Sequence, residues 1–187
     1  MQAAHLSGGF ADPARDGAAA FRAALDAMAR PGRITRLSGA APPAPASPAA
    51  GALLLTLCDT TTPLCLAGDH DTDALGDWVR FHTGAPRAAR AEAAFALGTW
   101  DALAPLDADP TGTPDYPDRA ATLIVEMPAL AAAGARLSGP GIDGAAHLSL
   151  PEGIAARPGA FPLGLDLFLT CGADCAGLPR TTRVEDG

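Results

Sequence analysis

The chain has 187 residues, of which 13 are basic and 21 acidic, and its net charge is −8. This length is typical of one domain of roughly 100 to 200 residues, so we expect a single domain over residues 1–187. Apolar residues make up 48% of the chain, which excludes global disorder, and the negative charge disfavours binding to nucleic acid or to an anionic membrane.

The strongest helix signal lies near the N-terminus. Asp12 suits an N-cap, and Pro13 suits the first helical position. Apolar residues then recur at helical spacing, at Phe21, Leu25 and Met28, and we expect this stripe to pack against another surface. The pattern stops at a Pro-Gly pair, which predicts the end of the helix.

The rest of the chain predicts strands and helices in alternation, which is typical of an α/β protein. Strands are expected around residue 137 and over residues 34–37, 53–58, 64–67, 95–97, 123–127, 146–150 and 163–170. Further helices are expected over residues 72–82, 87–93 and 128–133. Irregular loops are expected over residues 40–50 and 107–119. The predicted fold class is therefore α/β, a mixed sheet flanked by helices.

No stretch of the sequence predicts secretion or insertion into a membrane. Residues 1–10 have neither the basic nor the apolar region of a signal peptide. The apolar runs at 51–58 and 120–127 are far shorter than the ~20 residues that span a bilayer. We therefore expect a soluble, cytoplasmic protein.

The four cysteines favour buried thiols over disulfides, because a cytoplasmic chain with a large core does not need disulfides. A zinc site is the alternative. It would use Cys171-x3-Cys175, with His70, His82 or His147 completing the ligand set, but no clean second pair of ligands follows the first. The prediction is therefore that the protein holds no metal.

All 13 basic residues are arginine, and the chain contains no lysine. A Schiff base to pyridoxal phosphate or to a carbonyl substrate needs a lysine amine, and a Walker A loop needs a lysine on the phosphates. Codon bias is a sufficient cause of this composition. Whatever the cause, neither chemistry can be built from this chain.

Two motifs match ligand-binding patterns only superficially. Residues 139–144, Gly-Pro-Gly-Ile-Asp-Gly, fit the dinucleotide pattern G-x-G-x-x-G, but Pro140 lacks the N–H that pyrophosphate binding needs, so a tight turn between strands is expected. Asp69-His70-Asp71-x-Asp73 could bind a hard cation through its carboxylates. It lacks the glycine turn and distal glutamate of an EF-hand loop, which favours a solvated acidic loop.

Two short groups of residues are candidates for ligand binding. His82 and Thr83 close a predicted helix, where a histidine either acts as acid, base or ligand or simply caps the helix end. Arg180, Thr181 and Thr182 offer a guanidinium fork and two hydroxyls, which suit a phosphate or carboxylate unless this segment is a solvated tail. From the residues alone, no complete catalytic constellation can be recognised.

Several motifs follow one another along nearly the whole chain. They are Phe10-x-Asp12-Pro13, Phe21-Arg22-x2-Leu25-x-Ala27-Met28-x-Arg30-Pro31-Gly32, Thr62-Pro63-Leu64, Phe81-His82-Thr83-Gly84, and residues 117–123, 137–142, 161–167 and 178–182. Their joint order and spacing resemble the H-subunit family of the bacterial carbon–phosphorus lyase system, through which bacteria use phosphonates as a source of phosphorus. Residues 14–15 and 17–18 depart from the family pattern at positions that look like surface.

The resemblance implies a fold like the large domain of pyridoxal-phosphate-dependent transferases, without the cofactor site and with no cofactor. It also implies a homodimer that joins the G, I and J subunits in a core complex. In that system the G, H, I and L proteins together transfer the ribose triphosphate of ATP to a phosphonate, and the radical J subunit later cleaves the carbon–phosphorus bond. The resemblance thus implies a subunit that is non-catalytic or only partly catalytic, and no catalytic residue is assigned.

A second hypothesis is a stand-alone phosphate-ester or nucleotide-binding enzyme. Its ligand-binding residues, for a nucleotide or a phosphonate, would be His82, Thr83, Arg119, Arg180, Thr181 and Thr182. This hypothesis requires that these residues converge on one concave surface. A third hypothesis is the metal protein built on Cys171 and Cys175.

Overall fold

A computed structural model of the chain describes residues 6–159 and 161–185. The description leaves out residues 1–5, 160 and 186–187, which belong to the single domain predicted over residues 1–187. The described residues form an α/β fold with a six-stranded sheet and a separate three-stranded sheet. The predicted fold class is therefore confirmed at the level of a mixed sheet with helices.

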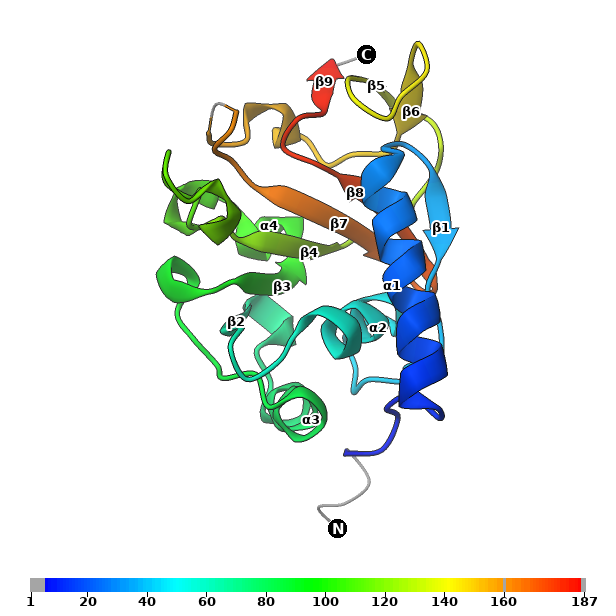
Figure 1. The fold of residues 1–187 in the computed structure, drawn as a ribbon, viewed down its shortest axis with the longest axis vertical. Coiled ribbons are helices and arrows are strands. Elements are labelled where there is room, and N and C mark those ends of the chain that lie inside the picture. Colours follow the sequence, from blue (N-terminus) through cyan, green and yellow to red (C-terminus); the bar gives the residue numbers. More distant parts are fainter. Residues whose placement is uncertain (1–5, 160, 186–187) are drawn as a thin grey trace.

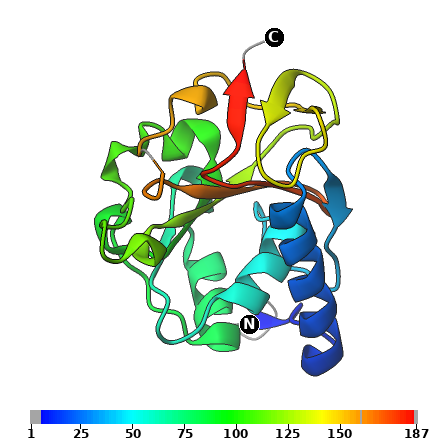
Figure 2. The same cartoon turned by 45° about the horizontal axis from the view of Figure 1, so that its top comes forward.

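The long helices cover one face of the large sheet, and the small sheet lies over the other (Figures 1 and 2). The helices are α1 (Pro13–Ala29), α2 (Pro48–Leu57), α3 (Asp73–Thr83) and the short α4 (Trp100–Leu103). Single 3-10 turns are η2 (Gly68–His70), η3 (Arg90–Glu92), η4 (Leu106–Ala108), η5 (Pro117–Arg119) and η6 (Ile154–Ala156).

The large sheet has the order β1-β8-β7-β4-β3-β2. Its strands are β1 (Ile34–Arg36), β2 (Leu64–Leu66), β3 (Phe95–Thr99), β4 (Thr122–Glu126), β7 (Asp166–Cys171) and β8 (Asp174–Leu178). Strands β2, β3, β4 and β7 are parallel, whereas β8 runs antiparallel to both β7 and β1. The small antiparallel sheet has the order β6-β5-β9 and consists of β5 (Ala135–Ser138), β6 (Ala146–Leu148) and β9 (Arg183–Glu185).

Strand β4 shows why the large sheet is buried on both faces. Successive side chains of a strand point to opposite faces. Ile124 therefore belongs to the core under α1, α2 and α3, while Leu123 and Val125 belong to the core under the small sheet. All three side chains are fully buried. A strand of this kind reads as a continuous apolar run, and the strand predicted at 123–127 is confirmed one residue earlier, at 122–126.

Helix α1 begins as predicted, because the Asp12 side chain accepts a hydrogen bond from the backbone N–H of Arg15 and Pro13 follows it. Within the chain, its predicted apolar stripe is only partly packed. Phe21 and Leu25 are 45% and 53% exposed, and Met28 is only partly buried. The buried face of the helix consists of alanines, namely Ala20, Ala24 and Ala27.

The alanine face is explained by the close approach of α1 to strand β8. A Cβ atom added to Gly177 would lie 2.6 Å from the backbone oxygen of Ala27 and 2.8 Å from the backbone nitrogen of Met28. Only small side chains fit between a helix and a strand at this distance. The larger apolar side chains of α1 therefore lie outside this close contact, on the side of the helix.

The strand predicted at 53–58 is wrong, because these residues belong to helix α2 and its C-cap. Every residue from 49 to 54 is buried, so the helix has no polar face and shows no helical period in its sequence. The start of α2 nevertheless has a local sequence signal. The Ser47 hydroxyl accepts a hydrogen bond from the N–H of Ala50, and Pro48 occupies the first turn, inside the segment predicted to be a loop.

Smaller differences concern the connections. The helix predicted at 87–93 is reduced to the turn η3, and no helix forms at 128–133 among the described residues. The short strands β8 and β9 were not predicted. The tight turn expected at 139–144 is confirmed between β5 and β6, and the helix expected at 72–82 is confirmed as α3. Among the described residues, no helix has the length and apolarity that crossing a bilayer requires.

The loop predicted at 107–119 is anchored by a buried ion pair. Asp109 is 5% exposed, and its Oδ1 atom accepts a hydrogen bond of 2.7 Å from Arg90 Nε. Arg90 Nη2 donates to the second carboxylate oxygen and, at 2.6 Å, to the carbonyl of Leu103. This bidentate pairing raises the pKa of the Arg90 guanidinium, mainly through the hydrogen bond to Asp109.

The contact at Gly177 makes a testable prediction about stability. The substitution Gly177→Ala should lower the free energy of unfolding by about 2 kcal/mol, because the added methyl group meets helix backbone, which cannot move aside as a side chain can. Urea denaturation followed by circular dichroism measures this change. The matched control is Gly17→Ala, since an added Cβ there has one contact, 3.9 Å from Phe10, and α1 should gain about 0.5–1 kcal/mol. Equal effects of the two substitutions would contradict the prediction.

Candidate functional site

Arg180 follows strand β8 and is held in place by Asp166 at the start of β7. Its backbone N–H donates to Asp166 Oδ1 at 2.8 Å, Nε donates at 3.1 Å to Oδ2, and Nη2 donates to Oδ2 at 2.6 Å. Nη1 donates to the carbonyl oxygens of Pro117 at 2.8 Å and Pro162 at 3.2 Å. A guanidinium has five N–H donors. Four of the five are therefore used to join three segments of the chain, so Arg180 does not lie in a solvated tail.

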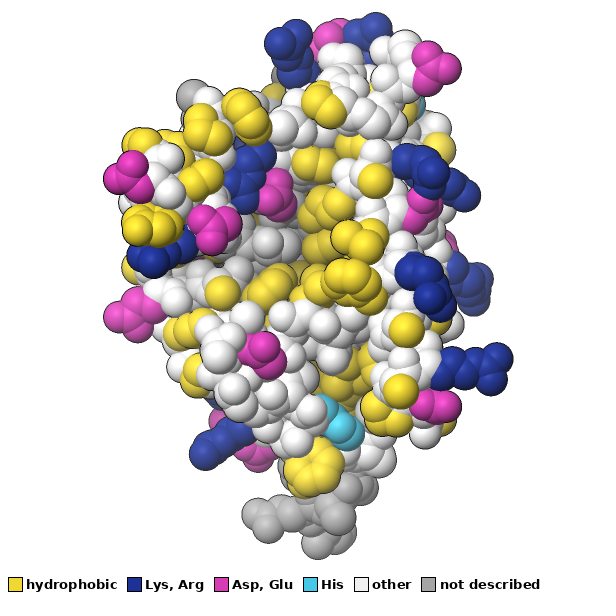
Figure 3. Space-filling view, in the orientation of Figure 1, with side chains coloured by type: hydrophobic (Ala, Val, Ile, Leu, Met, Phe, Trp, Pro, Cys, Tyr) yellow, Lys and Arg dark blue, Asp and Glu magenta, His cyan; other side chains and the backbone are white. Residues whose placement is uncertain are grey.

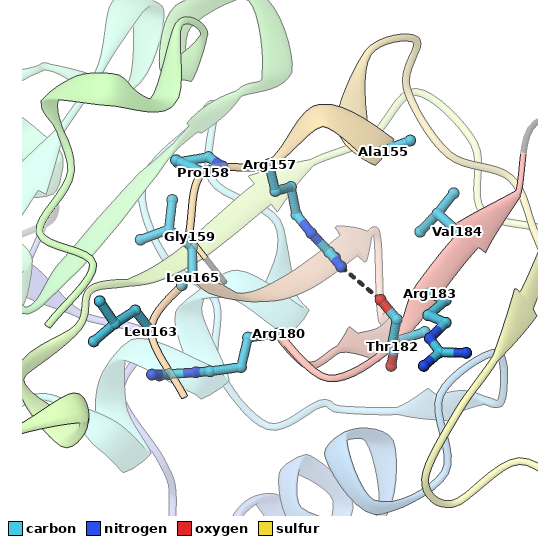
Figure 4. A pocket seen from close by; sticks show the side chains of 11 residues that line it. Ala155, Arg157, Pro158, Gly159, Leu163, Leu165, Arg180, Thr182, Arg183 and Val184 are labelled. Carbon is cyan, nitrogen blue, oxygen red and sulfur yellow. Dashed lines mark hydrogen bonds between the residues drawn. The ribbon is translucent and has the colours of Figure 1, made fainter. Parts of the chain in front are cut away.

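Two adjoining cavities lie beside the segment between β8 and β9. Both are lined by Arg180, Thr182 and Arg183. The first, of about 280 Å³, lies between η6, the segment 157–165 and β9 (Figure 4). The second, of about 570 Å³, is lined by Thr181 together with residues 139–140 of the turn after β5. We call the first the arginine cavity, because its described lining residues include Arg157, Arg180 and Arg183 and contain no carboxylate.

The interior of the arginine cavity contains polar atoms without partners. Arg157 Nη2 donates a 2.9 Å hydrogen bond to the backbone oxygen of Thr182, which Figure 4 shows as a dashed line. Arg157 Nη1 and the Thr182 hydroxyl are buried and have no hydrogen-bond partner within the described part of the chain. A buried polar group without a partner costs about 1–3 kcal/mol, so an acceptor placed between these donors would be stabilising.

The electrostatics of the arginine cavity also favour an anion. Burial lowers the pKa of the Arg157 guanidinium, and the carboxylate of Asp166 partly opposes this effect. Arginine stays protonated in proteins, so its positive charge is kept in a poorly solvated place. Asp166 is already paired with Arg180. An oxyanion is the chemical group that would both compensate the charge and accept hydrogen bonds from Arg157 and Thr182.

The predicted ligand-binding residues divide into separate groups. Arg180, Thr181 and Thr182 line the two adjoining cavities. Arg119 lies nearby on η5, whose Pro117 carbonyl accepts from Arg180, but its guanidinium lies 4.1 Å from the centre of the Tyr116 ring. Sequence reasoning did not identify Arg157. A buried arginine in a loop carries no local sequence signal, since only the fold brings it next to Thr182.

His82 and Thr83 lie at the end of α3, far along the molecule from β9 (Figure 1). The His82 ring contacts Trp78 edge-on, with centroids 4.9 Å apart, and its Nε2 lies 2.9 Å from the Leu6 carbonyl oxygen. The Thr83 hydroxyl donates to Val79 and accepts from the N–H of Ala85, which closes the helix. These two residues therefore do not join the arginine cavity within one chain.

The cysteines do not assemble a metal site within the described residues, where no group of three metal-ligating side chains occurs. Cys175 is buried in β8, whereas Cys171 at the end of β7 is partly exposed. Burial raises the pKa of Cys175 to about 12, which disfavours the thiolate that zinc binds. In the acidic loop, Asp71 and Asp73 instead pair with Arg87.

The fold and the cavity define an α/β protein with a largely parallel sheet and a cationic, hydroxyl-bearing cavity beside it. The chain belongs to the bacterial phosphonate metabolism protein (PhnH) family, because residues 8–185 match that family. It is 41% identical, over 96% of its own length and 95% of the relative's, to the alpha-D-ribose 1-methylphosphonate 5-triphosphate synthase subunit PhnH of Rhizobium meliloti. It is 31% identical to the putative C-P lyase subunit protein HtxG of Stutzerimonas stutzeri, over 89% of this chain and 84% of that protein.

The environment of the thiols leads to a labelling prediction. At about pH 8 a disulfide reagent should modify Cys171 first, because Cys58 and Cys175 are buried and burial raises the pKa of each to about 12. All four thiols should react in denaturing urea. Mass spectrometry of labelled peptides identifies the sites, and Cys171→Ser should remove the fast phase. Labelling of Cys175 as fast as Cys171, or release of zinc during labelling, would contradict the assignment of structural thiols.

Proposed function

We propose that this chain is an accessory subunit of the complex that makes alpha-D-ribose 1-methylphosphonate 5-triphosphate during phosphonate catabolism. The observation that carries the proposal is the 41% identity, over 96% of the chain, to a protein named as a subunit of that synthase. In this role the chain supports the transfer of the ribose triphosphate of ATP to an alkylphosphonate and is not catalytic alone.

The partners in this proposal are the G, I and J subunits of the carbon–phosphorus lyase core complex, in the cytoplasm. The proposal includes a fold like the large domain of pyridoxal-phosphate-dependent transferases. The parallel strands β2, β3, β4 and β7 are compatible with such a domain. A chain without lysine could keep that architecture only without the cofactor's Schiff base.

The arginine cavity gives this subunit a place for a phosphonate or phosphate group. Arg157 Nη1 and the Thr182 hydroxyl would donate to its oxygens, and Arg183 on the same cavity wall would add positive charge. The bonds of Arg180 to Asp166 and to the carbonyls of Pro117 and Pro162 would hold the wall in position and leave one guanidinium N–H for the ligand. Such a group occurs in alkylphosphonates and in the triphosphate of a nucleotide.

The subunit role predicts that other subunits of the complex are recovered with this protein. The tagged chain, purified from phosphate-starved cells of its source, should carry the G, I and J subunits in near-equal amounts, as measured by mass spectrometry of the eluate. Cells grown with ample phosphate serve as the control. Recovery of the chain without these subunits from the starved cells, or phosphonate transferase activity of the chain alone, would refute the accessory role.

A homodimer is the second part of the proposal, and the exposed side of α1 supports it. Phe21, Leu25 and Met28 line an apolar groove of about 370 Å³ together with Phe95 and Phe168 of the sheet. Figure 3 shows hydrophobic side chains gathered in a band beside α1. A second copy of the chain would cover this band by presenting the same α1 surface, as in a two-fold symmetric interface.

The α1 groove makes a prediction about the oligomeric state. The substitution Leu25→Asp should convert the dimer to a monomer, because it would bury a carboxylate against Phe21 and its symmetry mate. Sedimentation velocity measures the change in mass. Arg22→Gln alters the neighbouring exposed residue of α1 and should leave the dimer intact. A wild-type monomer at micromolar concentration, or a dimer that survives Leu25→Asp, would exclude this interface.

A further inference from the structure

A separate and larger cavity, of about 1070 Å³, lies at the carboxyl ends of the central parallel strands. Thr99 ends β3, Glu126 ends β4, and His70 belongs to the turn η2 that follows β2; all three line the cavity. In open α/β sheets, ligands bind in the crevice outside the carboxyl ends of the strands. The arginine cavity is formed by other residues, since the two sets of lining residues have no member in common.

The walls of this cavity carry negative charge. Asp101, Glu126 and Glu152 line it, and its described lining residues include no arginine. Phosphate, phosphonate and carboxylate groups would be repelled here, because like charges at short range in a partly desolvated site are destabilising. The cavity is therefore suited to a positively charged group. The indole of Trp100 provides the aromatic face on which such a cation can rest.

His70 indicates that the cavity receives a ligand. Its side chain is 3% exposed, it belongs to the cavity lining, and neither ring nitrogen has a hydrogen-bond partner within the described residues. Burial lowers the pKa of this imidazole, although Glu126 and Asp69 oppose the effect. The neutral ring has one donor and one acceptor nitrogen. Leaving both without partners in a buried site costs about 1–3 kcal/mol for each, so a ligand that donates an N–H to the ring would be stabilising.

The chain holds the polar walls in position without using up their charges. Glu126 Oε1 accepts a 2.6 Å hydrogen bond from the backbone N–H of Ser47, the N-cap residue of α2. The Trp100 Nε1 atom donates at 3.0 Å to the backbone oxygen of Glu152, which orients the indole. No ion pair to Asp101, Glu126 or Glu152 occurs among the described residues. A held Glu126 carboxylate without an ion-pair partner, beside an oriented indole, forms a partly prearranged site for a cation, and the exposed Asp101 and Glu152 add negative charge at its edge.

We propose that the cavity formed by His70, Trp100 and Glu126 binds an organic cation, namely a guanidinium or alkylammonium group. Its charge is balanced by Glu126 and Asp101, its flat or methylene surface lies against the Trp100 indole, and one of its N–H groups donates to His70. Two sources can supply this chemistry: a free organic amine, or an arginine or lysine side chain of a partner protein. The proposal does not depend on the function proposed above, since it uses none of the residues of the arginine cavity.

Calorimetric titration with two matched probes tests the charge requirement. N-acetylarginine amide carries one guanidinium, and N-acetylcitrulline amide replaces it with a neutral ureido group of almost the same shape. The full-length protein should bind the arginine probe with a stoichiometry of one and about tenfold more tightly than the citrulline probe, as expected for one or two partly buried charge contacts. Inorganic phosphate should not compete. Equal binding of the two probes, or binding of neither, would overturn the proposal.

Substitutions assign the binding to this cavity. Glu126→Gln keeps an oxygen that can accept from Ser47 and removes the charge, and Trp100→Phe keeps an aromatic ring of smaller area. Each should weaken the arginine probe about fivefold or more, with unchanged circular dichroism spectra. Asp115→Asn, which removes an exposed carboxylate outside the cavity lining, should not change the affinity. Unchanged affinity in both folded cavity variants would refute the site.

Assembly of the complex distinguishes the two sources. If a partner's basic side chain occupies the cavity, Glu126→Gln should reduce co-purification of the other subunits and the assembled wild-type complex should no longer bind the arginine probe. If a free amine is the ligand, assembly should be unaffected and the complex should still bind the probe. Both results support a cation site. Failure of the isolated chain to bind the arginine probe overturns it and leaves the subunit role, which co-purification of the wild-type chain tests separately.

Discussion

Burial of both faces of the six-stranded sheet is the constraint on which the rest of the structure depends. Parallel strands cannot leave one face in water, because their side chains are apolar on both sides. Ile124 faces the helical layer, and its neighbours Leu123 and Val125 face the layer that contains the small sheet. The helices must therefore come close to one face, which requires Gly177 under α1. The small sheet and the irregular segments must cover the other.

The irregular segments that cover the second face also form the cavities, and a few arginines hold them together. Arg180 joins the start of β7 to the carbonyls of Pro117 and Pro162, and Arg90 joins Asp109 to the end of α4. Each uses the planar fork that only arginine offers, which lysine could not replace with the same geometry. In this chain, an all-arginine composition therefore has structural consequences beyond charge.

The arginine cavity and the larger cavity lined by His70 and Glu126 have opposite electrostatic character, although they lie in one negatively charged chain. The arginine cavity takes Arg157 from the end of η6 and Arg183 from the start of β9. The larger cavity takes its carboxylates from the end of β4, from α4 and from the loop before η6. Both contain buried polar atoms without partners in the described structure. Net charge thus predicts that the whole protein avoids nucleic acid, but it does not predict what an individual cavity binds.

Elements with local signals could be predicted from the amino-acid sequence. The N-cap of α1, the run of β4, the turn at 139–144 and the ordered motifs that identify the family are contained in neighbouring residues. It did not distinguish the buried helix α2 from a strand, since a helix without a polar face loses its period. Packing of the layers, in contrast, buries the alanine side of α1, places Arg157 beside Thr182 and separates His82 from Arg180. These relations join residues far apart in the chain, and contacts at that separation follow from how the layers pack rather than from any local preference.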